Sequence, residues 1–156
     1  PIKGIENSIE ATEYLSGKEV GDNVIIIGGG LTGCEIAYDL ILKGKKPTIV
    51  EMKNDLIAVK GVCLANSSFL REMLAYKKAP VYLETTVKEI RPDGATVTDK
   101  NGKDFDLTGD SVIVSIGYHP TPLTPASKHV HLVGDADKVG NLRTVIWRAW
   151  DVCMKI

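Results

Sequence analysis

The sequence predicts an α/β protein with a Rossmann-like parallel sheet in which a β-meander replaces one crossover helix. Three observations carry this prediction. An apolar run at 24–27 leads into a glycine-rich turn, a helical pattern follows over 31–43, and a second apolar run ends at Glu51. This order of strand, turn, helix, strand and acid is typical of the βαβ unit that binds a dinucleotide.

The glycine-rich turn divides its tasks between three glycines. Gly28 allows a tight turn out of the strand, and Gly30 lets the backbone approach a pyrophosphate because it has no Cβ. Gly33 lets the helix pack against the strand, while free N–H groups at the helix start face the phosphates. Glu51, 18 residues after Gly33, can accept hydrogen bonds from an adenosine ribose. The alternative is a turn without a ligand. The candidate site comprises Gly28, Gly29, Gly30, Leu31, Thr32, Gly33, Glu51 and Met52.

Helical periodicity and end signals place further helices. Gly44 ends the first helix, and a short helix is expected earlier, around 10–15. A second long helix is expected over 67–76, where Asn66 or Ser67 can cap the start. The expected buried stripe of that helix comprises Phe69, Leu70, Met73 and Leu74.

After this helix the pattern becomes strand-like. A strand at 81–83 would extend the parallel sheet. Turn signals at 92–94 and 101–102 separate short alternating runs, which predicts an antiparallel meander. The three expected strands of the meander are 86–90, 95–99 and 104–107.

A buried run over 111–116 predicts one more strand of the parallel sheet, which ends at Gly117. Ligands of open α/β sheets lie beyond the carboxyl ends of the strands. Gly28, Glu51 and Gly117 all fall at such ends, so three separated segments are expected to face one crevice.

The last part of the chain combines a connector, a strand and a helix. Residues 119–129 are rich in Pro, Thr and Ser, which is typical of a connector. A short apolar strand is expected at 130–133, then a turn at 134–136 and a helix over 142–156. One face of that helix carries Val145, Ile146, Ala149 and Val152.

Composition and charge exclude several classes of function. The 156 residues suffice for one domain with a core, at 44% hydrophobic and 25% charged residues and a net charge of −1. No basic stripe argues for nucleic acid, and no apolar run approaches the ~20 residues that span a bilayer. A signal peptide is not expected, because glycines follow the first apolar run.

The cysteines and histidines give no sign of a metal or catalytic centre. Three widely spaced cysteines without a C-x-x-C pair fit a reducing, cytoplasmic setting. Cys34 lies where the helix dipole could lower its pKa, and the alternative is a small packing residue. We expect no metal site and no general acid or base, since His119, His129 and His131 all follow the last strand of the domain.

The motifs together resemble flavoproteins with two dinucleotide-binding domains, in which a nicotinamide domain is inserted into an FAD domain. The resemblance covers nearly the whole chain and is carried by Val24 to Gly33, Glu51, Asp110 to Gly117 and His131 to Asp135. Within these pyridine nucleotide-disulfide oxidoreductase-like proteins, the phrase IGGGLTGCEIAYDLILKGKKPTIVEM is most similar to the C-terminal part of 2-enoate and 2,4-dienoyl-CoA reductases, relatives of old yellow enzyme.

The resemblance implies roles for individual residues. The three glycines of the turn would hold the pyrophosphate of NADH, and Glu51 its adenosine ribose. Glu35 corresponds to a family glutamate near the nicotinamide; alternatively it is a solvated acid on the helix surface. Gly117 matches a glycine lining the nicotinamide pocket. Gly134 and Asp135 resemble the second flavin motif, whose aspartate binds the ribityl or pyrophosphate region; alternatively Asp135 is a turn residue.

The resemblance also predicts how the chain is divided. Residues 1–22 would be a lead-in from an FAD domain, 23–120 an NAD(H)-binding domain, and 121–156 a connector, flavin motif and C-terminal helix returning to the FAD domain. The first flavin motif, the FMN barrel and the iron–sulfur cysteines of the family are missing here, so we expect an excised piece. Such a piece would bind NADH, would not retain FAD, and would be inactive alone.

The expected function is therefore the NADH-binding portion of an ene-reductase-type enzyme that passes electrons from FAD toward FMN. NADH is favoured because Glu51 would repel a 2′-phosphate, with only Lys53 to compensate. Alternatives are an NADH oxidase, an amine dehydrogenase, a ferredoxin-linked reductase, or a non-catalytic nucleotide module. The expected partners are the FAD domain and FMN barrel, and the face with Trp147 and Trp150 could pack on the former or form a homodimer.

Overall fold

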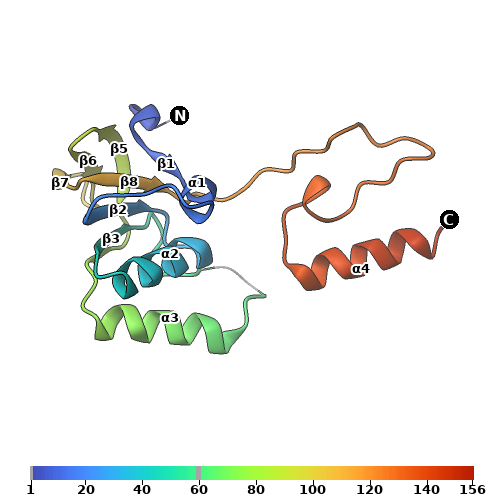
Figure 1. Cartoon of the computed structure of the whole chain (residues 1–156), viewed down its shortest axis with the longest axis horizontal. Helices are drawn as coiled ribbons and strands as arrows, with labels where there is room; N and C mark the ends of the chain where they lie inside the picture. Colours follow the sequence, from blue (N-terminus) through green and yellow to red (C-terminus); the bar gives the residue numbers. More distant parts are fainter. Residues whose placement is uncertain (1, 59–60) are drawn as a thin grey trace. The chain divides into compact units, whose positions relative to one another are not determined.

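A computed structural model describes residues 2–58 and 61–156. These residues form two compact units, with the boundary between Ile116 and Gly117. Figure 1 shows the elements of each unit. The larger unit holds the two sheets and three of the α-helices, and the smaller unit holds a 3₁₀ turn and the last helix.

The larger unit is built on a five-stranded parallel sheet in the order β1-β8-β2-β3-β4. In β2 and β3 each residue from Asn23 to Ile27 pairs in register with one from Lys46 to Val50. This fixes the carboxyl ends of the two strands side by side. The strands are β1 (Ile9–Glu10), β2 (Asn23–Ile27), β3 (Lys46–Val50), β4 (Val81–Tyr82) and β8 (Ser111–Val114). The predicted fold class is confirmed.

Both faces of this sheet are buried, because helices cover one face and the second sheet covers the other. Successive side chains of β2 point to opposite faces and so enter both parts of the core. Val24 and Ile26 pack toward the helices α1 (Ala11–Leu15), α2 (Leu31–Leu42) and α3 (Leu64–Tyr76). Ile25 and Ile27 pack toward the second sheet. Figure 1 shows this layering, with α2 and α3 on one side of the parallel sheet and the second sheet on the other.

The second sheet is the expected antiparallel meander, in the order β5-β6-β7. Its strands are β5 (Thr86–Arg91), β6 (Gly94–Thr98) and β7 (Asp104–Thr108), joined by the two predicted turns. Their buried side chains, among them Ile90, Ala95 and Val97, complete the core on that side. The prediction of a meander in place of a crossover helix is therefore confirmed.

Helix α3 differs from the sequence prediction at its start. It begins at Leu64 with Cys63 as the N-cap residue, so the predicted cap at Asn66 or Ser67 is wrong. Ser67 lies inside the helix, where its buried hydroxyl donates to the Leu64 carbonyl at 3.1 Å. Neither a side-chain cap nor a buried residue marks this start, since Cys63 makes no cap hydrogen bond and Leu64 is exposed, whereas the predicted start assumed a polar cap.

The buried stripe of α3 is narrower than predicted. Leu70 and Leu74 are buried, but Phe69 is 49% exposed. Phe69 packs edge-on against Tyr38 of α2, with ring centroids 5.5 Å apart, instead of entering the core. The two-helix contact therefore extends to the protein surface, where one edge of an aromatic ring remains in water.

The first 22 residues contribute to the larger unit. After the 3₁₀ turn η1 (Ile5–Asn7), β1 pairs with β8 at the edge of the sheet, and α1 follows directly. Tyr14 of α1 is buried, and its hydroxyl donates to Asp39 of α2 at 2.5 Å. The expected division at residues 22 and 120 concerns the origin of these segments and stays a prediction.

The smaller unit contains η2 (Gly134–Ala136) and α4 (Leu142–Cys153). The strand expected at 130–133 is wrong: in the described residues this stretch has only an isolated bridge between Ser127 and Val130. An apolar run becomes a strand only where a neighbouring strand accepts its hydrogen bonds, and none is paired with it here. Asn141 caps α4, accepting from the Thr144 N–H at 3.0 Å.

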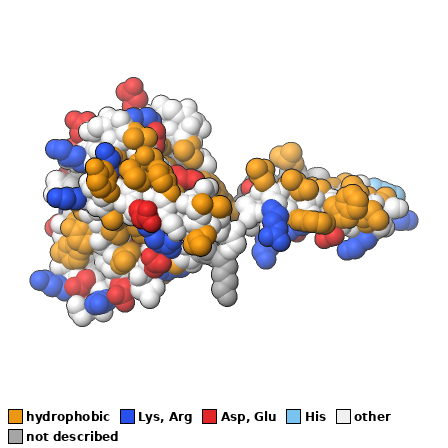
Figure 2. All heavy atoms as spheres, turned by 90° about the horizontal axis from the view of Figure 1, so that it is seen from below, with side chains coloured by type: hydrophobic (Ala, Val, Ile, Leu, Met, Phe, Trp, Pro, Cys, Tyr) orange, Lys and Arg blue, Asp and Glu red, His pale blue; other side chains and the backbone are white. Residues whose placement is uncertain are grey.

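Helix α4 carries no buried residue within the smaller unit. Val145, Ala149 and Val152 are half-buried, and Gly134 lies against Val145. Figure 2 shows apolar side chains gathered on this unit between basic ones. The exposed apolar residues of the helix and its C-terminal end are Leu142, Ile146, Trp147, Trp150, Met154 and Ile156.

In the part of the chain that the structure describes, no helix has both the length and the apolar character needed to cross a membrane.

We predict that Asp110→Ala lowers the melting temperature at pH 7. The Asp110 carboxylate accepts from the backbone N–H and the side-chain amide of Asn23, each at 2.8 Å, and joins the starts of β8 and β2. These bonds hold the pKa of Asp110 below its ordinary value of 3.8. A lowered folded-state pKa gives stability that is complete above the ordinary value and lost as pH falls through the folded value.

Thermal melts of both proteins from pH 7 to pH 2 check this prediction. The difference in melting temperature stays constant down to about pH 4.5 and narrows below it. A difference that is the same at pH 2 as at pH 7 would show that the charge of Asp110 is irrelevant.

Candidate functional site

The turn between β2 and α2 is shaped by two glycines that the protein itself requires. Gly28 has φ 108°, and a Cβ there would lie 2.2 Å from the Ser115 carbonyl oxygen on the strand β8 side. A Cβ on Gly33 would lie 2.0 Å from the Gly28 carbonyl oxygen. Both contacts are with backbone, which cannot move aside. The close approach of helix and strand expected from the sequence is present.

Gly30 differs from these two glycines, because no contact within the described residues requires it. Its backbone lies at φ −69° and ψ −176°, a conformation open to any residue, and a Cβ there would meet no atom of residues 2–58 or 61–156 within 4 Å. Gly30 is also the N-cap of α2, and among the described residues no side chain caps this 12-residue helix. The first N–H groups of α2 therefore have no side-chain partner there, and the residue before them leaves free space where a Cβ would be.

Glu51 follows β3 directly and is 8% exposed. One carboxylate oxygen, Oε2, accepts the Gly29 N–H at 2.6 Å, and Oε1 accepts the Lys53 N–H at 2.8 Å. Within the described residues each oxygen thus makes one hydrogen bond, whereas a carboxylate can accept about four. Glu51 thus ties the glycine turn to the end of β3, and its two carboxylate oxygens can accept further hydrogen bonds beside the turn.

The segment after Glu51 packs on the same turn. A Cβ on Gly29 would lie 2.6 Å from Leu56 Cδ2, so the middle glycine of the turn makes room for this leucine. The Ile57 N–H donates to the Gly29 carbonyl at 2.7 Å. Met52, which the sequence predicts as a site residue, is 69% exposed. The sequence signal for Leu56 was its place at the start of the apolar run 56–59, directly after the polar residues 53–55.

The other expected site residues lie apart from these contacts. Leu31 and Thr32 are half-buried in the first turn of α2, and Glu35, close behind them, is exposed. Gly117 follows β8 by three residues and has φ 105°. Their predicted roles toward a nicotinamide stay predictions.

Gly134 and Asp135 belong to the smaller unit. Gly134 is buried at φ 61° in η2, and Asp135 is exposed. The Asp135 carboxylate accepts the Gly140 N–H at 3.2 Å, as a turn residue does. This bond supports the interpretation of Asp135 as a turn residue, and its role as a flavin ligand stays a prediction.

Cys34 is fully buried in the core beneath the turn. Burial raises the pKa of its thiol to about 12, which outweighs the opposing effect of Arg71. The thiol is therefore protonated at neutral pH, and its Sγ lies 3.5 Å from the Gly29 carbonyl oxygen. The packing role is supported and a reactive thiolate is not.

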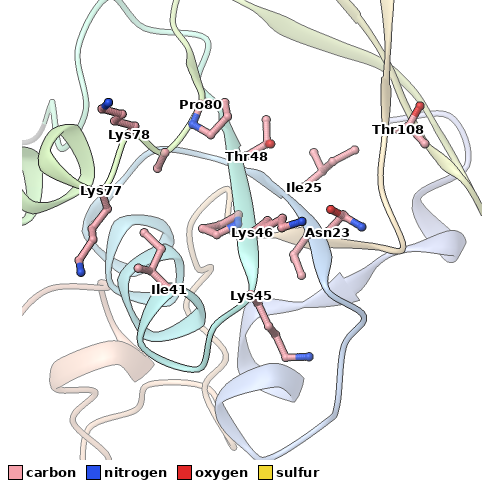
Figure 3. A pocket seen from close by; sticks show the side chains of 13 residues that line it. Asn23, Ile25, Ile41, Lys45, Lys46, Thr48, Lys77, Lys78, Pro80 and Thr108 are labelled. Atoms are coloured by element: carbon pink, nitrogen blue, oxygen red, sulfur yellow. The ribbon is translucent and has the colours of Figure 1, made fainter.

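A cavity of about 430 Å³ lies at the amino-terminal ends of β2 and β3, at the end of the strands opposite to the glycine turn (Figure 3). Four lysines line it, and they follow the C-terminal ends of α2 and α3. Cations there stabilise the negative ends of the helix dipoles. The lysines are Lys45, Lys46, Lys77 and Lys78, and among the described residues no cluster of metal-ligating side chains accompanies them or occurs elsewhere.

The turn, the uncapped helix and the acid at the end of β3 together define a dinucleotide-binding unit of Rossmann type. The family model for pyridine nucleotide-disulphide oxidoreductases matches residues 1–139. The chain belongs to this family.

Two relatives and one solved structure place the chain within the family. It is 36% identical to a cinnamate reductase from Clostridium sporogenes, over 99% of this chain and 24% of that protein. It is 31% identical to an NADH oxidase from Thermoanaerobacter brockii, over 99% of this chain and 26% of that protein. The structure of a 2-naphthoyl-CoA reductase superposes with a TM-score of 0.86 at 25% identity, over 99% of this chain and 24% of that one. The resemblance to 2-enoate reductase-type flavoproteins is confirmed, and the chain spans about a quarter of the length of these relatives.

We predict that iodoacetamide modifies two of the three cysteines in the folded protein. Cys63 and Cys153 are exposed, whereas Cys34 is buried and has a raised pKa. At pH 8 a thiol of pKa about 12 is almost entirely protonated, and only the thiolate reacts. Peptide mass spectrometry identifies the modified residues, and the urea-unfolded protein, with all three modified, is the control. Rapid modification of Cys34 in the folded protein would contradict its burial.

Proposed function

We propose that this chain is the NADH-binding portion of a flavin-dependent oxidoreductase of the ene-reductase type. The observation that carries the proposal is Gly30. The residues that the structure describes impose no steric or conformational need for a glycine there, yet Gly30 lies at the start of α2, where no side chain of theirs caps the helix. A pyrophosphate explains this, because it needs close approach to the helix N-terminus.

Glu51 supports the same function. Its two bonds to backbone N–H groups fix the carboxylate beside the turn before any ligand arrives. The remaining lone pairs can accept the adenosine ribose hydroxyls. A 2′-phosphate would bring negative charge to this buried acid, so we propose NADH as the preferred nucleotide.

The chain supplies position, and the bound nucleotide supplies the hydride. The helix N–H groups and Glu51 would hold the pyrophosphate and ribose, while Glu35 and Gly117 would border the nicotinamide. We propose that FAD receives the hydride and that an FMN barrel and iron–sulfur centre lie further along, on other parts of a longer protein. Gly134 and Asp135 would belong to the FAD site, and the setting would be cytoplasmic.

A second candidate is the NADH-binding part of an NADH oxidase, favoured by the Thermoanaerobacter brockii relative. It uses the same nucleotide site and differs in where the electrons go. An amine dehydrogenase, a ferredoxin-linked reductase and a non-catalytic nucleotide module would also keep this fold. Nucleotide binding by this chain is common to all five, so it is tested first.

We predict that Gly30→Ala weakens nucleotide binding with little effect on stability, whereas Gly33→Ala lowers the stability of the fold. Gly30→Ala changes the free energy of unfolding by less than about 1 kcal/mol, because a poorer N-cap is offset by lower unfolded-state entropy. It weakens NADH binding at least tenfold, because a methyl group occupies the phosphate approach. Gly33→Ala destabilises the fold by at least about 2 kcal/mol through its clash with the Gly28 carbonyl.

Urea unfolding and NADH titration by tryptophan quenching measure both effects. Unchanged NADH affinity in Gly30→Ala would remove the observation on which the proposed function rests. FAD that copurifies at one equivalent with the wild-type chain would contradict the assignment of flavin binding to other parts of the protein.

We predict that wild-type protein binds NADH more tightly than NADPH and that Glu51→Gln removes this preference. Glutamine keeps one oxygen for the Gly29 N–H and so preserves the bond that ties the turn to the end of β3, but it loses the bond from the Lys53 N–H and the negative charge. Glu51→Ala, by contrast, frees two backbone N–H groups and loosens the turn as well. Separate titrations with NADH and NADPH give the ratio of dissociation constants. Tighter NADPH binding by the wild type would overturn the assignment of NADH.

A further inference from the structure

Both backbone polar groups of Gly29 form hydrogen bonds with the segment 51–57, which follows β3. The Gly29 N–H donates to Glu51 at 2.6 Å, and the Gly29 carbonyl accepts the Ile57 N–H at 2.7 Å. Leu56 and Ile57 are 7% and 3% exposed, so their side chains anchor the segment in the core. The position of the glycine turn is thus set from the segment that follows β3.

This contact is made by a strained residue. Ile57 has φ 52°, in the left-handed region that a β-branched side chain rarely adopts. Its N–H is the group that bonds to Gly29. Strained backbone persists only where surrounding contacts hold it, so something must fix residues 55–57 from outside.

Arg71 of α3 supplies that contact. Its Nη2 donates to the Leu56 carbonyl at 2.5 Å and to the Asp55 carboxylate at 3.0 Å. One guanidinium nitrogen therefore forms hydrogen bonds with the two consecutive residues immediately before Ile57. Leu70 and Leu74 of the same helix are buried in the core. They fix the position of α3 and therefore the backbone from which Arg71 donates its hydrogen bonds.

We propose that Arg71 is a positioning residue for the nucleotide. Together with Asp55 it clamps residues 55–57 onto the glycine turn and so sets the affinity for the adenosine half of the dinucleotide. Arg71 acts through Leu56, Ile57 and Gly29. This inference rests on the proposed function, because the clamped elements, Gly29 and Glu51, belong to the proposed pyrophosphate and ribose site.

The experiment compares Arg71→Met and Asp55→Asn with Lys77→Met, which removes a cation from the C-cap of the same helix, away from the segment. Hydrogen exchange reports the Ile57 amide, with Ile26 and Ile49 in β2 and β3 as core references. Titrations with NADH, ADP-ribose and nicotinamide mononucleotide report the two halves of the site. ADP-ribose carries the ribose and pyrophosphate without the nicotinamide ring.

In Arg71→Met we expect faster exchange at Ile57 with unchanged exchange at the core references. NADH and ADP-ribose bind about tenfold more weakly, by the same factor, since one hydrogen-bonded charge is lost. Nicotinamide mononucleotide is unaffected. Asp55→Asn has a smaller effect of the same kind, and Lys77→Met behaves as the wild type. If Arg71→Met also loses core protection, Asp55→Asn decides the outcome.

Two results would overturn the inference separately from the proposed function. Unchanged Ile57 exchange in folded Arg71→Met and Asp55→Asn would show that no clamp exists. Faster Ile57 exchange with wild-type NADH and ADP-ribose affinity would show a clamp without influence on the site. Failure of the wild type to bind any of the three ligands would instead overturn the proposed function, and with it the role of Arg71 toward a nucleotide.

Discussion

The hydrogen bond from Gly29 to Glu51 is the contact on which the rest of the site depends. The register of β2 and β3 places Ile27 beside Val50, so the chain leaves both strands at the same level. A 2.6 Å bond between a backbone N–H and a buried carboxylate then ties the two exits together. This fixes the turn, the turn fixes the start of α2, and the uncapped helix end is aimed beyond the sheet.

The glycines of this turn are explained by two different causes. Gly28 and Gly33 are required by the protein, since a Cβ at each would overlap a backbone oxygen, that of Ser115 or that of Gly28, and Gly29 leaves room for the side chain of Leu56. At Gly30 a Cβ would meet no described atom within 4 Å, and the backbone conformation is an ordinary one. A sequence motif does not separate these causes, because it records only the residue type. The coordinates separate them and leave one glycine whose explanation lies outside the protein.

The sequence predicted the elements whose signals are local. The run into Gly28, the helix after it, Glu51 and the meander turns all follow from short-range periodicity and turn chemistry. It did not predict β1, because two residues carry no period, and it predicted a strand at 130–133 that has no partner strand. The grip of Arg71 on Leu56 joins residues 15 apart through side-chain geometry, which no local pattern records.

A buried acid beside a backbone turn would ordinarily be a cost, since burial disfavours the charged form. Here two backbone N–H groups compensate Glu51, and they do so with bonds that also set its direction. An acceptor held in place before binding loses little entropy when ribose hydroxyls arrive. In the proposed function the same bonds thus shape the turn and favour NADH over NADPH, because a 2′-phosphate would meet a carboxylate that is held in place.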